Sequence, residues 1–573
     1  MRPYRGVFWT ALLLSPINQT FALVQPYLLK VGIDRYIRRG DAGGLRGLGL
    51  VFAAAIVGEL VSSYGQQYLT MVVAQRSLGD LRGALFAHLQ RLPMRFFDTT
   101  PVGKLVSRVT TDVDVLNEMF AAGAMTIVLD GLKLAGIVGF MLWINWRLAL
   151  VSLALLPAMA VGVDYFRRAA RRTYREIRER VARINGYLQE AISGIKVIAL
   201  SAREDAAFVE FRRLNADHRD ANHLSNKLEA TLFSLVESVS TVSIALMLWQ
   251  GGRLRARGLV EIGTVVAFIQ YIQQFFVPIR DFSAKYAVVQ SSMTAAERIF
   301  ALLDVPAAPV PARPRVPDAV RGAIAFEGVW FAYRDAEWVL RDVSFRIAPG
   351  ERVAIVGATG SGKTTLVKLL GRLYDVQRGR ILVDGVDVRE WDPVALRRRI
   401  AVVLQDVFLF SGPVADNIHL GRTDIPPAAV AAAARHVNAD GFIRRLGGYE
   451  AQVRERGSNL SGGQRQLLAF ARALAHDPAI LVLDEATSSV DPETEWLVQD
   501  ALTKLLAGRT ALVIAHRLST IEGADRILVV HKGELREQGT HRELLARGGI
   551  YARLYRMQYA PAARATARAA GEG

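Results

Sequence analysis

The chain has 573 residues, which is too long for one hydrophobic core, so at least two domains are expected. It has no cysteine, which excludes disulfides, zinc–cysteine sites and thiol chemistry. Apolar residues make up 51% and concentrate before residue 300, and the net charge is +17. This distribution predicts a membrane half followed by a soluble half. Much of the arginine stands beside apolar segments, which favours lipid headgroups over nucleic acid as its partner.

Six apolar stretches in the first half are near or above the roughly 20 residues that a helix needs to cross the hydrocarbon core. They lie at about residues 6–33, 47–74, 119–144, 148–166, 231–249 and 262–280. No secretory cleavage pattern follows the first stretch, so it is expected to stay in the protein. The long segments 75–118 and 167–230 are polar but have few glycines or prolines, which predicts helices that continue well beyond the bilayer.

Four ionisable residues fall near the middle of predicted spans: Glu59, Asp130, Lys133 and Glu237. A charge there costs about 2.5 to 3.5 kcal/mol, so each is a candidate to line a wet cavity or the protein interior. Asp130 and Lys133 stand three apart on one helix, which favours a local ion pair over a cavity role. Glu59 and Glu237 have no such neighbour and would suit cationic or zwitterionic amphiphiles.

Five prolines between Asp304 and Arg321 predict an extended, semi-rigid connector. We therefore expect a helical transmembrane domain at 1–304, a linker at 305–321 and a soluble domain at 322–558. The soluble domain alternates short apolar strands with helical patterns, which predicts an α/β fold. The alanine- and arginine-rich tail, 559–573, is expected to be disordered.

In the soluble half, the apolar run Val353–Val356 leads into Gly357–Thr364, which fits the pattern G-x-x-x-x-G-K-[ST] between a strand and a helix. Its glycines let backbone N–H groups converge on an anion at a helix N-terminus. Lys363 is expected to reach the outer phosphates of ATP, and Thr364 to bind Mg²⁺. A plain glycine-rich connection is the alternative, which the Lys-Thr pair argues against.

A second apolar run, Ile480–Leu483, ends in Asp484 and Glu485. Phosphoryl transfer from MgATP needs a carboxylate for the metal and another group to orient the attacking water, which suits Asp484 and Glu485 in that order. Helix capping is the alternative for such a carboxylate pair. His516, at the end of another apolar strand, can donate a hydrogen bond to a γ-phosphate, although a lone histidine there is more often structural.

Residues 459–464 contain Leu-Ser-Gly-Gly-Gln, and with this motif the chain resembles an ATP-binding cassette (ABC) transporter over nearly its whole length. Tyr333 resembles the aromatic that stacks on adenine. The Walker A loop comprises Gly357, Ala358, Thr359, Gly360, Ser361, Gly362, Lys363, Thr364 and Thr365, while Gln405 resembles the Q-loop glutamine that contacts Mg²⁺. Glu455 falls in the X-loop, and Ser461, Gly462, Gly463 and Gln464 form the signature. Asp484 with Glu485 resembles Walker B, Asp491 lies in the D-loop, and His516 resembles the switch histidine. Arg454 departs from the family, because many exporters have glycine there.

The membrane half resembles the same family. Phe96-Phe97-Asp98 and Asp112 resemble the first intracellular loop of exporters, whose coupling helix docks on the nucleotide domain, and a second coupling helix is expected around 201–213. The chain begins almost directly with its first span, without the family's amphipathic elbow helix. Six spans and one cassette make a half-transporter, so a second chain is implied, either a copy of this one or a paralogue. The resemblance places two ATP molecules between Walker motifs of one chain and the signature of the other.

The resemblance implies ATP-driven export of amphiphilic drugs or lipids across the cytoplasmic (inner) membrane of a bacterium, with the ATP-binding domain in the cytoplasm. Lipid flipping and peptide export are alternatives within this class. Import of a siderophore through an exporter fold is less favoured, as is a membrane-anchored regulatory ATPase, which the polar residues in the spans argue against. A soluble DNA-repair ATPase shares the cassette motifs, but six spans exclude it, so no nucleic-acid partner is expected.

Overall fold

The computed structural model describes residues 2–122, 124–334, 337–484, 492–515 and 518–558. The chain forms two compact units. The helical unit comprises Met1–Gln90 and Val102–Pro306, and the α/β unit comprises Arg91–Pro101 and Ala307–Gly573. The chain passes from the first unit to the second at Pro306, within its proline-rich stretch. The predicted tail at 559–573 lies outside the described residues.

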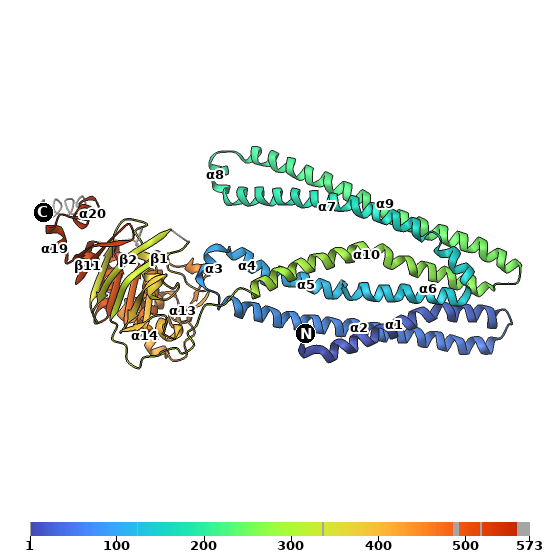
Figure 1. Ribbon diagram of the computed structural model, residues 1–573, viewed down its shortest axis with the longest axis horizontal. Helices are drawn as coiled ribbons and strands as arrows, with labels where there is room; N and C mark the ends of the chain where they lie inside the picture. Colours follow the sequence, from blue (N-terminus) through green and yellow to red (C-terminus); the bar gives the residue numbers. More distant parts are fainter. Residues whose placement is uncertain (1, 123, 335–336, 485–491, 516–517, 559–573) are drawn as a thin grey trace. The chain divides into compact units, whose positions relative to one another are not determined.

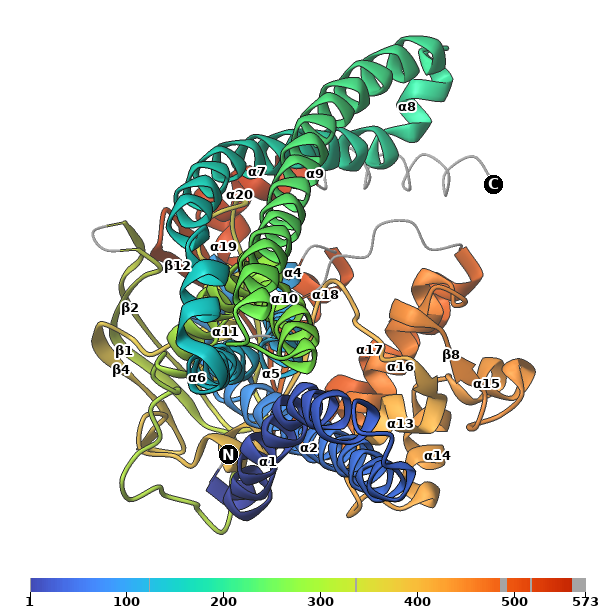
Figure 2. The ribbon, with the colours of Figure 1, turned by 90° about the vertical axis from the view of Figure 1, so that its right-hand side faces the viewer.

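The helical unit is built from long helices that greatly exceed the thickness of a bilayer. Its elements are η1 (Arg2–Tyr4), α1 (Arg5–Val31), the π-helical turn η2 (Gly32–Ile37), α2 (Ala42–Leu89), α4 (Val102–Val109), α5 (Thr111–Ala122), α6 (Ala124–Leu153), α7 (Leu156–Ser193), α8 (Ile195–Leu200), α9 (Glu204–Ala256) and α10 (Ile262–Leu303). The 53 residues of α9 extend about 80 Å at 1.5 Å per residue. Figures 1 and 2 show α7 and α9 side by side, diverging from the other helices toward α8. The predicted helical extensions are therefore present.

Five helices among the described residues are long and apolar enough to cross a membrane. The predicted fourth span, 148–166, is not one uninterrupted helix. The backbone of α6 is non-helical at Asn145, whose Oδ1 accepts a hydrogen bond from the Leu148 N–H at 3.1 Å and so starts a new helical segment. A second break separates Leu153 from α7, which has a proline in its first turn. The apolar part of α7, Leu156–Phe166, is consequently short.

Side chains of α6, α9 and α10 form the core of the helical unit. Met141, Met247 and Phe268 are fully buried there. The buried Tyr271 hydroxyl of α10 donates to the Leu23 carbonyl of α1 at 2.7 Å. The buried Asp34 of η2 accepts a hydrogen bond from the Gly263 N–H at 2.7 Å, in the first turn of α10. These two contacts join the first and last long helices of the unit.

The described residues of the α/β unit form three sheets and their covering helices. Its elements are α3 (Met94–Thr99), β1 (Ile324–Ala332), β2 (Trp338–Ile347), β3 (Arg352–Val356), α11 (Lys363–Leu370), β4 (Arg378–Val383), β5 (Val386–Asp387), α12 (Pro393–Arg399), β6 (Ile400–Val403), β7 (Gly412–Pro413), α13 (Val414–His419), α14 (Pro427–His436), α15 (Asp440–Leu446), β8 (Gln452–Val453), η3 (Glu455–Gly457), α16 (Gly462–Ala475), β9 (Ile480–Asp484), α17 (Pro492–Leu506), β10 (Thr510–Ile514), α18 (Leu518–Glu522), β11 (Arg526–His531), β12 (Glu534–Gly539), α19 (His541–Ala546) and α20 (Ile550–Gln558).

The main sheet has the strand order β12-β11-β3-β10-β9-β6, and all its strands run parallel except the edge strand β12. Side chains of β3 alternate between two cores: Val353 and Ile355 pack with α11, whereas Ala354 and Val356 pack with α16. Burial on both faces explains the continuous apolar runs in the sequence. The carboxyl ends of parallel strands share one edge, so the phosphate loop after β3 and Asp484 at the end of β9 lie on the same side. The predicted fold class, a helical transmembrane domain followed by an α/β domain, is confirmed.

The structure tests the positions of the two short helices predicted for the intracellular loops. In the first, α3 packs within the α/β unit, where the Tyr374 hydroxyl donates a hydrogen bond to Asp98. Burial and this carboxylate raise the pKa of Tyr374. In the second loop the predicted position, 201–213, is wrong. Gly194 ends α7, and the short helix is α8, Ile195–Leu200, while α9 already begins at Glu204.

Candidate functional site

The phosphate loop crosses from β3 to α11 in a conformation that depends on glycine. Gly360 and Gly362 have φ angles of 79° and 104°, in the left-handed region. A Cβ at Gly362 would lie 2.7 Å from Leu340 Cδ2 and 3.2 Å from the Val339 carbonyl oxygen. The neighbouring strand β2 therefore leaves no room for a side chain at the N-terminus of α11.

We expect Gly362→Ala to lower the stability of the α/β unit by about 1 to 3 kcal/mol, because it combines a strained φ with a clash. It should also weaken ATP binding, since the loop must shift. Gly350→Ala is the matched control, because Gly350 has a φ of 78° but no atom within 4 Å of its added Cβ. Thermal unfolding and binding of a fluorescent ATP analogue measure both effects. Wild-type ATP affinity in Gly362→Ala would contradict this view of the loop.

The lysine and threonine of the loop lie beside the carboxylate at the end of β9. Lys363 Nζ donates to the carbonyl oxygens of Gly357 and Ala358 at 2.8 and 3.0 Å. Burial lowers the pKa of Lys363, and the charge of Asp484 opposes this shift. Thr364 Oγ1 donates to Asp484 Oδ2 at 3.3 Å. A hydroxyl and a carboxylate oxygen are the hard ligands that Mg²⁺ prefers, so these two residues fit the predicted metal site.

Two further predicted residues lie beside this group. Gln405, two residues after the end of β6, lines a small cavity together with Asp484 and Gln466. Tyr333, directly after β1, has its hydroxyl 3.2 Å from Thr365 Oγ1 and its ring centroid 5.2 Å from that of Tyr374. The predicted adenine-stacking tyrosine is thus held against the first turns of α11.

The signature residues begin α16. Ser461 is the N-cap: its Oγ accepts a hydrogen bond from the Gln464 N–H at 3.2 Å, and the Ser461 N–H donates to Gln464 Oε1 at 3.0 Å. This capping box explains why serine and glutamine stand three residues apart. Ser461 and Gly462 are exposed, and Gly463 is buried. Among the described residues, no hydrogen bond joins the signature to the phosphate loop. The structure therefore groups Tyr333, the loop, Gln405 and Asp484, and leaves the signature apart.

Three predicted residues, Glu485, Asp491 and His516, lie outside the described residues. The X-loop is held by Asn459, whose Oδ1 accepts the Arg454 N–H at 2.9 Å. Sequence reasoning missed Gln466, which lies in the second turn of α16 and shares the cavity of Gln405. The only local signal that could have identified Gln466 is its position two residues after the signature.

Two of the four ionisable residues in the spans, Asp130 and Glu59, have partners on other helices. Asp130 of α6 forms an ion pair with Lys285 of α10, so the predicted pair with Lys133 is wrong. Lys285 was overlooked because α10 continues beyond the apolar stretch that ends near 280. Glu59 of α2 accepts a hydrogen bond from Gln25 of α1. Glu237 is exposed on α9 in the single chain.

Comparison with known proteins agrees with this arrangement. The ABC transporter transmembrane region matches residues 8–279, and the ABC transporter family matches residues 340–488. The chain is 38% identical to an ATP-dependent lipid A-core flippase of Chromohalobacter salexigens, over 98% of this chain and 96% of that protein. It is 35% identical to a putative multidrug export ATP-binding/permease protein, YgaD, of Bacillus subtilis, over 97% of this chain and 98% of that protein. A solved structure of a bacterial Atm1-family ABC exporter with ATP bound matches with a TM-score of 0.78 and 27% identity, covering 97% of this chain and 98% of that one.

These matches extend over both halves of the chain and include the phosphate loop, the signature and the β9 carboxylate. A helical membrane region fused to one ATP-binding domain is the half-transporter arrangement, which implies that two chains assemble. The chain therefore belongs to the ABC transporter family, as an ATP-hydrolysing half-transporter of the exporter fold.

Proposed function

We propose that this protein exports amphiphilic small molecules, drugs or lipids, across the cytoplasmic membrane of a bacterium. The observation that carries the proposal is the nearly full-length similarity to relatives named for multidrug export and for flipping lipid A-core. Both relatives match the membrane helices and the ATP-binding domain of this chain, so the similarity extends over the complete half-transporter.

The geometry supports defined roles for the nucleotide-site residues. Lys363 binds the outer phosphates of ATP, and Tyr333 stacks on the adenine. Thr364, Asp484 and Gln405 would hold Mg²⁺, which would neutralise phosphate charge. Thr364 Oγ1 lies 3.3 Å from Asp484 Oδ2, and Gln405 lines the same cavity as Asp484. Glu485, next in the chain, orients the attacking water, and His516 donates a hydrogen bond to the γ-phosphate.

The second ATP contact comes from another chain. Ser461 and Gly462 present exposed groups at the N-terminus of the 14-residue helix α16, where N–H groups favour a phosphate. Asp491 of the D-loop would lie at the same interface. A dimer is further supported by α8, where Ile195, Val197 and Leu200 are 56%, 67% and 89% exposed. An apolar surface of this kind suits docking on the partner's nucleotide unit.

We propose a homodimer, because the chain carries a complete set of motifs. Purification of the complex from native membrane through a tag on this chain tests the proposal. Two copies of this chain support it, whereas a second, different chain in equal amount would establish a heterodimer.

Closure of two nucleotide units around ATP provides the driving step of the cycle. The α3 helix moves with the nucleotide unit, since Tyr374 and Asp98 join them. The motion is thereby passed to the intracellular loop that connects α2 to α4. Hydrolysis then releases the closed state and resets the transporter.

Reconstitution into liposomes without other proteins tests the function. We expect ATP turnover to be stimulated by cationic amphiphiles or lipids, with movement of the stimulating compound. Stimulation by peptides alone would favour peptide export. Inward movement of a metal–chelate complex would favour import, and ATP turnover without movement of any compound would identify a regulatory ATPase.

The intramembrane carboxylates predict a preference for positive charge. Replacing Glu59 and Glu237 together with glutamine should reduce transport of a cationic amphiphile about tenfold relative to its neutral analogue, since charges at the depth of the hydrocarbon core interact more strongly than charges in bulk water. The control is Glu179→Gln with Glu190→Gln, two exposed carboxylates on α7 beyond the spans. An unchanged ratio of cationic to neutral transport would show that neither residue lines the transport cavity. Asp130 and Lys133 remain further cavity candidates, and Asp130 is already paired with Lys285.

A further inference from the structure

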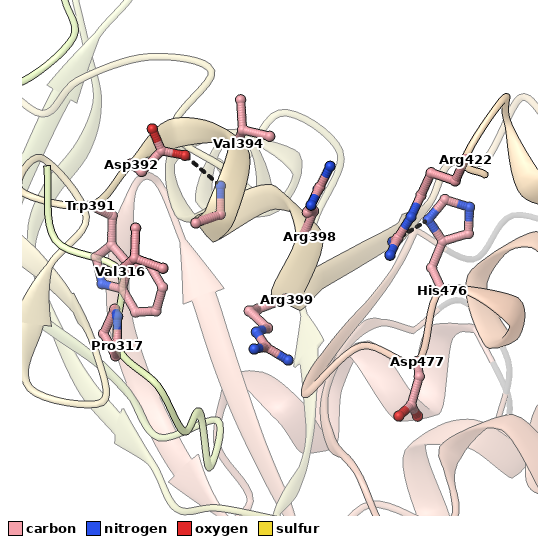
Figure 3. Close-up of a pocket in the computed structure, with 11 residues that line it drawn as sticks. Val316, Pro317, Trp391, Asp392, Val394, Arg398, Arg399, Arg422, His476 and Asp477 are labelled. Atoms are coloured by element: carbon pink, nitrogen blue, oxygen red, sulfur yellow. Dashed lines mark hydrogen bonds between the residues drawn. The ribbon is translucent and has the colours of Figure 1, made fainter. Parts of the chain in front are cut away.

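A pocket of about 380 Å³ lies on the α/β unit. Figure 3 shows the residues that line it. Arg399 lines it directly before β6, and His476 and Asp477 line it shortly before β9. The pocket is therefore at the amino ends of the parallel strands, whereas the phosphate loop follows the carboxyl end of β3. The four or five residues of these strands separate the two edges by about 15 Å.

Three arginines surround this pocket. Arg398 and Arg399 extend from the last turn of α12, and Arg422 lies across from them beside His476 (Figure 3). Both α12 arginines are exposed, and within the described part of the chain neither forms a hydrogen bond or an ion pair. The Arg422 guanidinium lies 3.3 Å from His476 Nδ1, which helps to fix its position.

Each carboxylate near the pocket has a partner, and only Asp424 has a pocket arginine as its partner. Asp392 Oδ1 accepts the Ala395 N–H at 2.7 Å and caps α12. Asp477 pairs with Arg509 at 3.2 Å. Asp424, beside the pocket, accepts a hydrogen bond from Arg422 Nε at 3.0 Å.

The positive charge of the arginines acts on two neighbouring titratable groups. Arg422, assisted by Arg398, lowers the pKa of Asp424 to about 2. Burial and the Arg422 charge lower the pKa of His476.

The rest of the lining is apolar. The Trp391 side chain is 1% exposed, while Val316 and Val394 are 62% and 60% exposed. Guanidinium groups bind phosphate oxygens in a planar, two-pronged geometry. The volume falls within the range of small-molecule sites. We propose that this pocket binds a phosphorylated organic anion, whose source is a soluble phosphate ester or a phospholipid headgroup.

The pocket also involves the connection between the two units. Val316 and Pro317 belong to the chain that leaves the helical unit at Pro306. The Arg315 N–H donates to the Glu390 carbonyl at 2.8 Å, and the Asp392 N–H donates to the Arg315 carbonyl at 3.0 Å. A bound anion contacts this connection and α12 together, so its binding stabilises their attachment.

The test uses the full-length protein in nanodiscs with Mg²⁺ and a non-hydrolysable ATP analogue, which keeps the nucleotide site occupied. Fructose 1,6-bisphosphate is the soluble probe, titrated by calorimetry at physiological salt. Phosphatidylglycerol is the lipid probe, and its retention is counted by native mass spectrometry. The variant is Arg398→Gln with Arg399→Gln. The control is Arg435→Gln with Arg445→Gln, two exposed arginines in the last turns of α14 and α15.

We expect one probe to bind, at least tenfold more weakly to the α12 variant and unchanged to the control. Binding of the soluble probe or of the lipid identifies the source, and either supports the site. The proposal is overturned if neither probe binds, if the α12 variant binds as tightly as wild type, or if sulfate displaces the probe equally well. ATP hydrolysis should be unchanged in both variants, so failure here is distinct from failure of the export function.

Discussion

Replacing Lys363 with alanine abolishes ATP-dependent transport, with an expected fall of 100-fold or more in ATP hydrolysis. Lys363 is 7% exposed, and its ammonium group lies inside the loop, where it donates hydrogen bonds to two loop carbonyl oxygens. Loss of one buried charged donor to a phosphate costs about 3 to 4 kcal/mol, which corresponds to this factor. Binding of a fluorescent ATP analogue should weaken in parallel.

Lys504→Ala is the control for the Lys363 variant. Lys504 makes a partly exposed ion pair with Asp500 on α17, and loss of such a pair has little effect on stability. Circular dichroism would confirm that both variants are folded. ATP hydrolysis near the wild-type rate in Lys363→Ala would refute the role of the loop.

Glu485→Gln should separate ATP binding from ATP hydrolysis. Loss of the group that orients and deprotonates water lowers the rate by about 10²- to 10⁴-fold. The neighbouring ligands Thr364 and Asp484 remain, so ATP still binds and holds two chains in the closed state. The measurements are single-turnover hydrolysis and retention of ATP by the dimer during gel filtration.

Asp484→Asn provides the contrast for the Glu485 variant. It removes a proposed metal ligand, so it should weaken Mg²⁺-dependent ATP binding instead of trapping the closed dimer. Rapid ATP turnover by Glu485→Gln would mean that another group orients the water.

The sequence predicted features that depend on local pattern. The phosphate loop between a strand and a helix and the strand ending at Asp484 each occupy a few consecutive residues, and each was found where expected. The long extensions of α2, α7 and α9 were also predictable, because few glycines or prolines interrupt them.

The features that sequence analysis missed depend on contacts between distant residues. Asp130 and Lys285 are 155 residues apart and meet because α6 packs against α10. The break at Asn145 depends on an amide side chain that takes over a backbone hydrogen bond within an apolar run. The basic pocket unites residues from before β1, α12 and the segments before β6 and β9, which no single motif contains.

The position of α3 has a consequence for recombination and for protein engineering. The α/β unit is made of two pieces of chain, since Arg91–Pro101 folds with residues beyond Pro306. A cassette excised at the proline-rich stretch loses this piece, and with it the Asp98 acceptor of Tyr374. Exchange of ATP-binding cassettes between related transporters should therefore succeed when both pieces are transferred together. The segment that must be exchanged is thus encoded by two separate stretches of the gene.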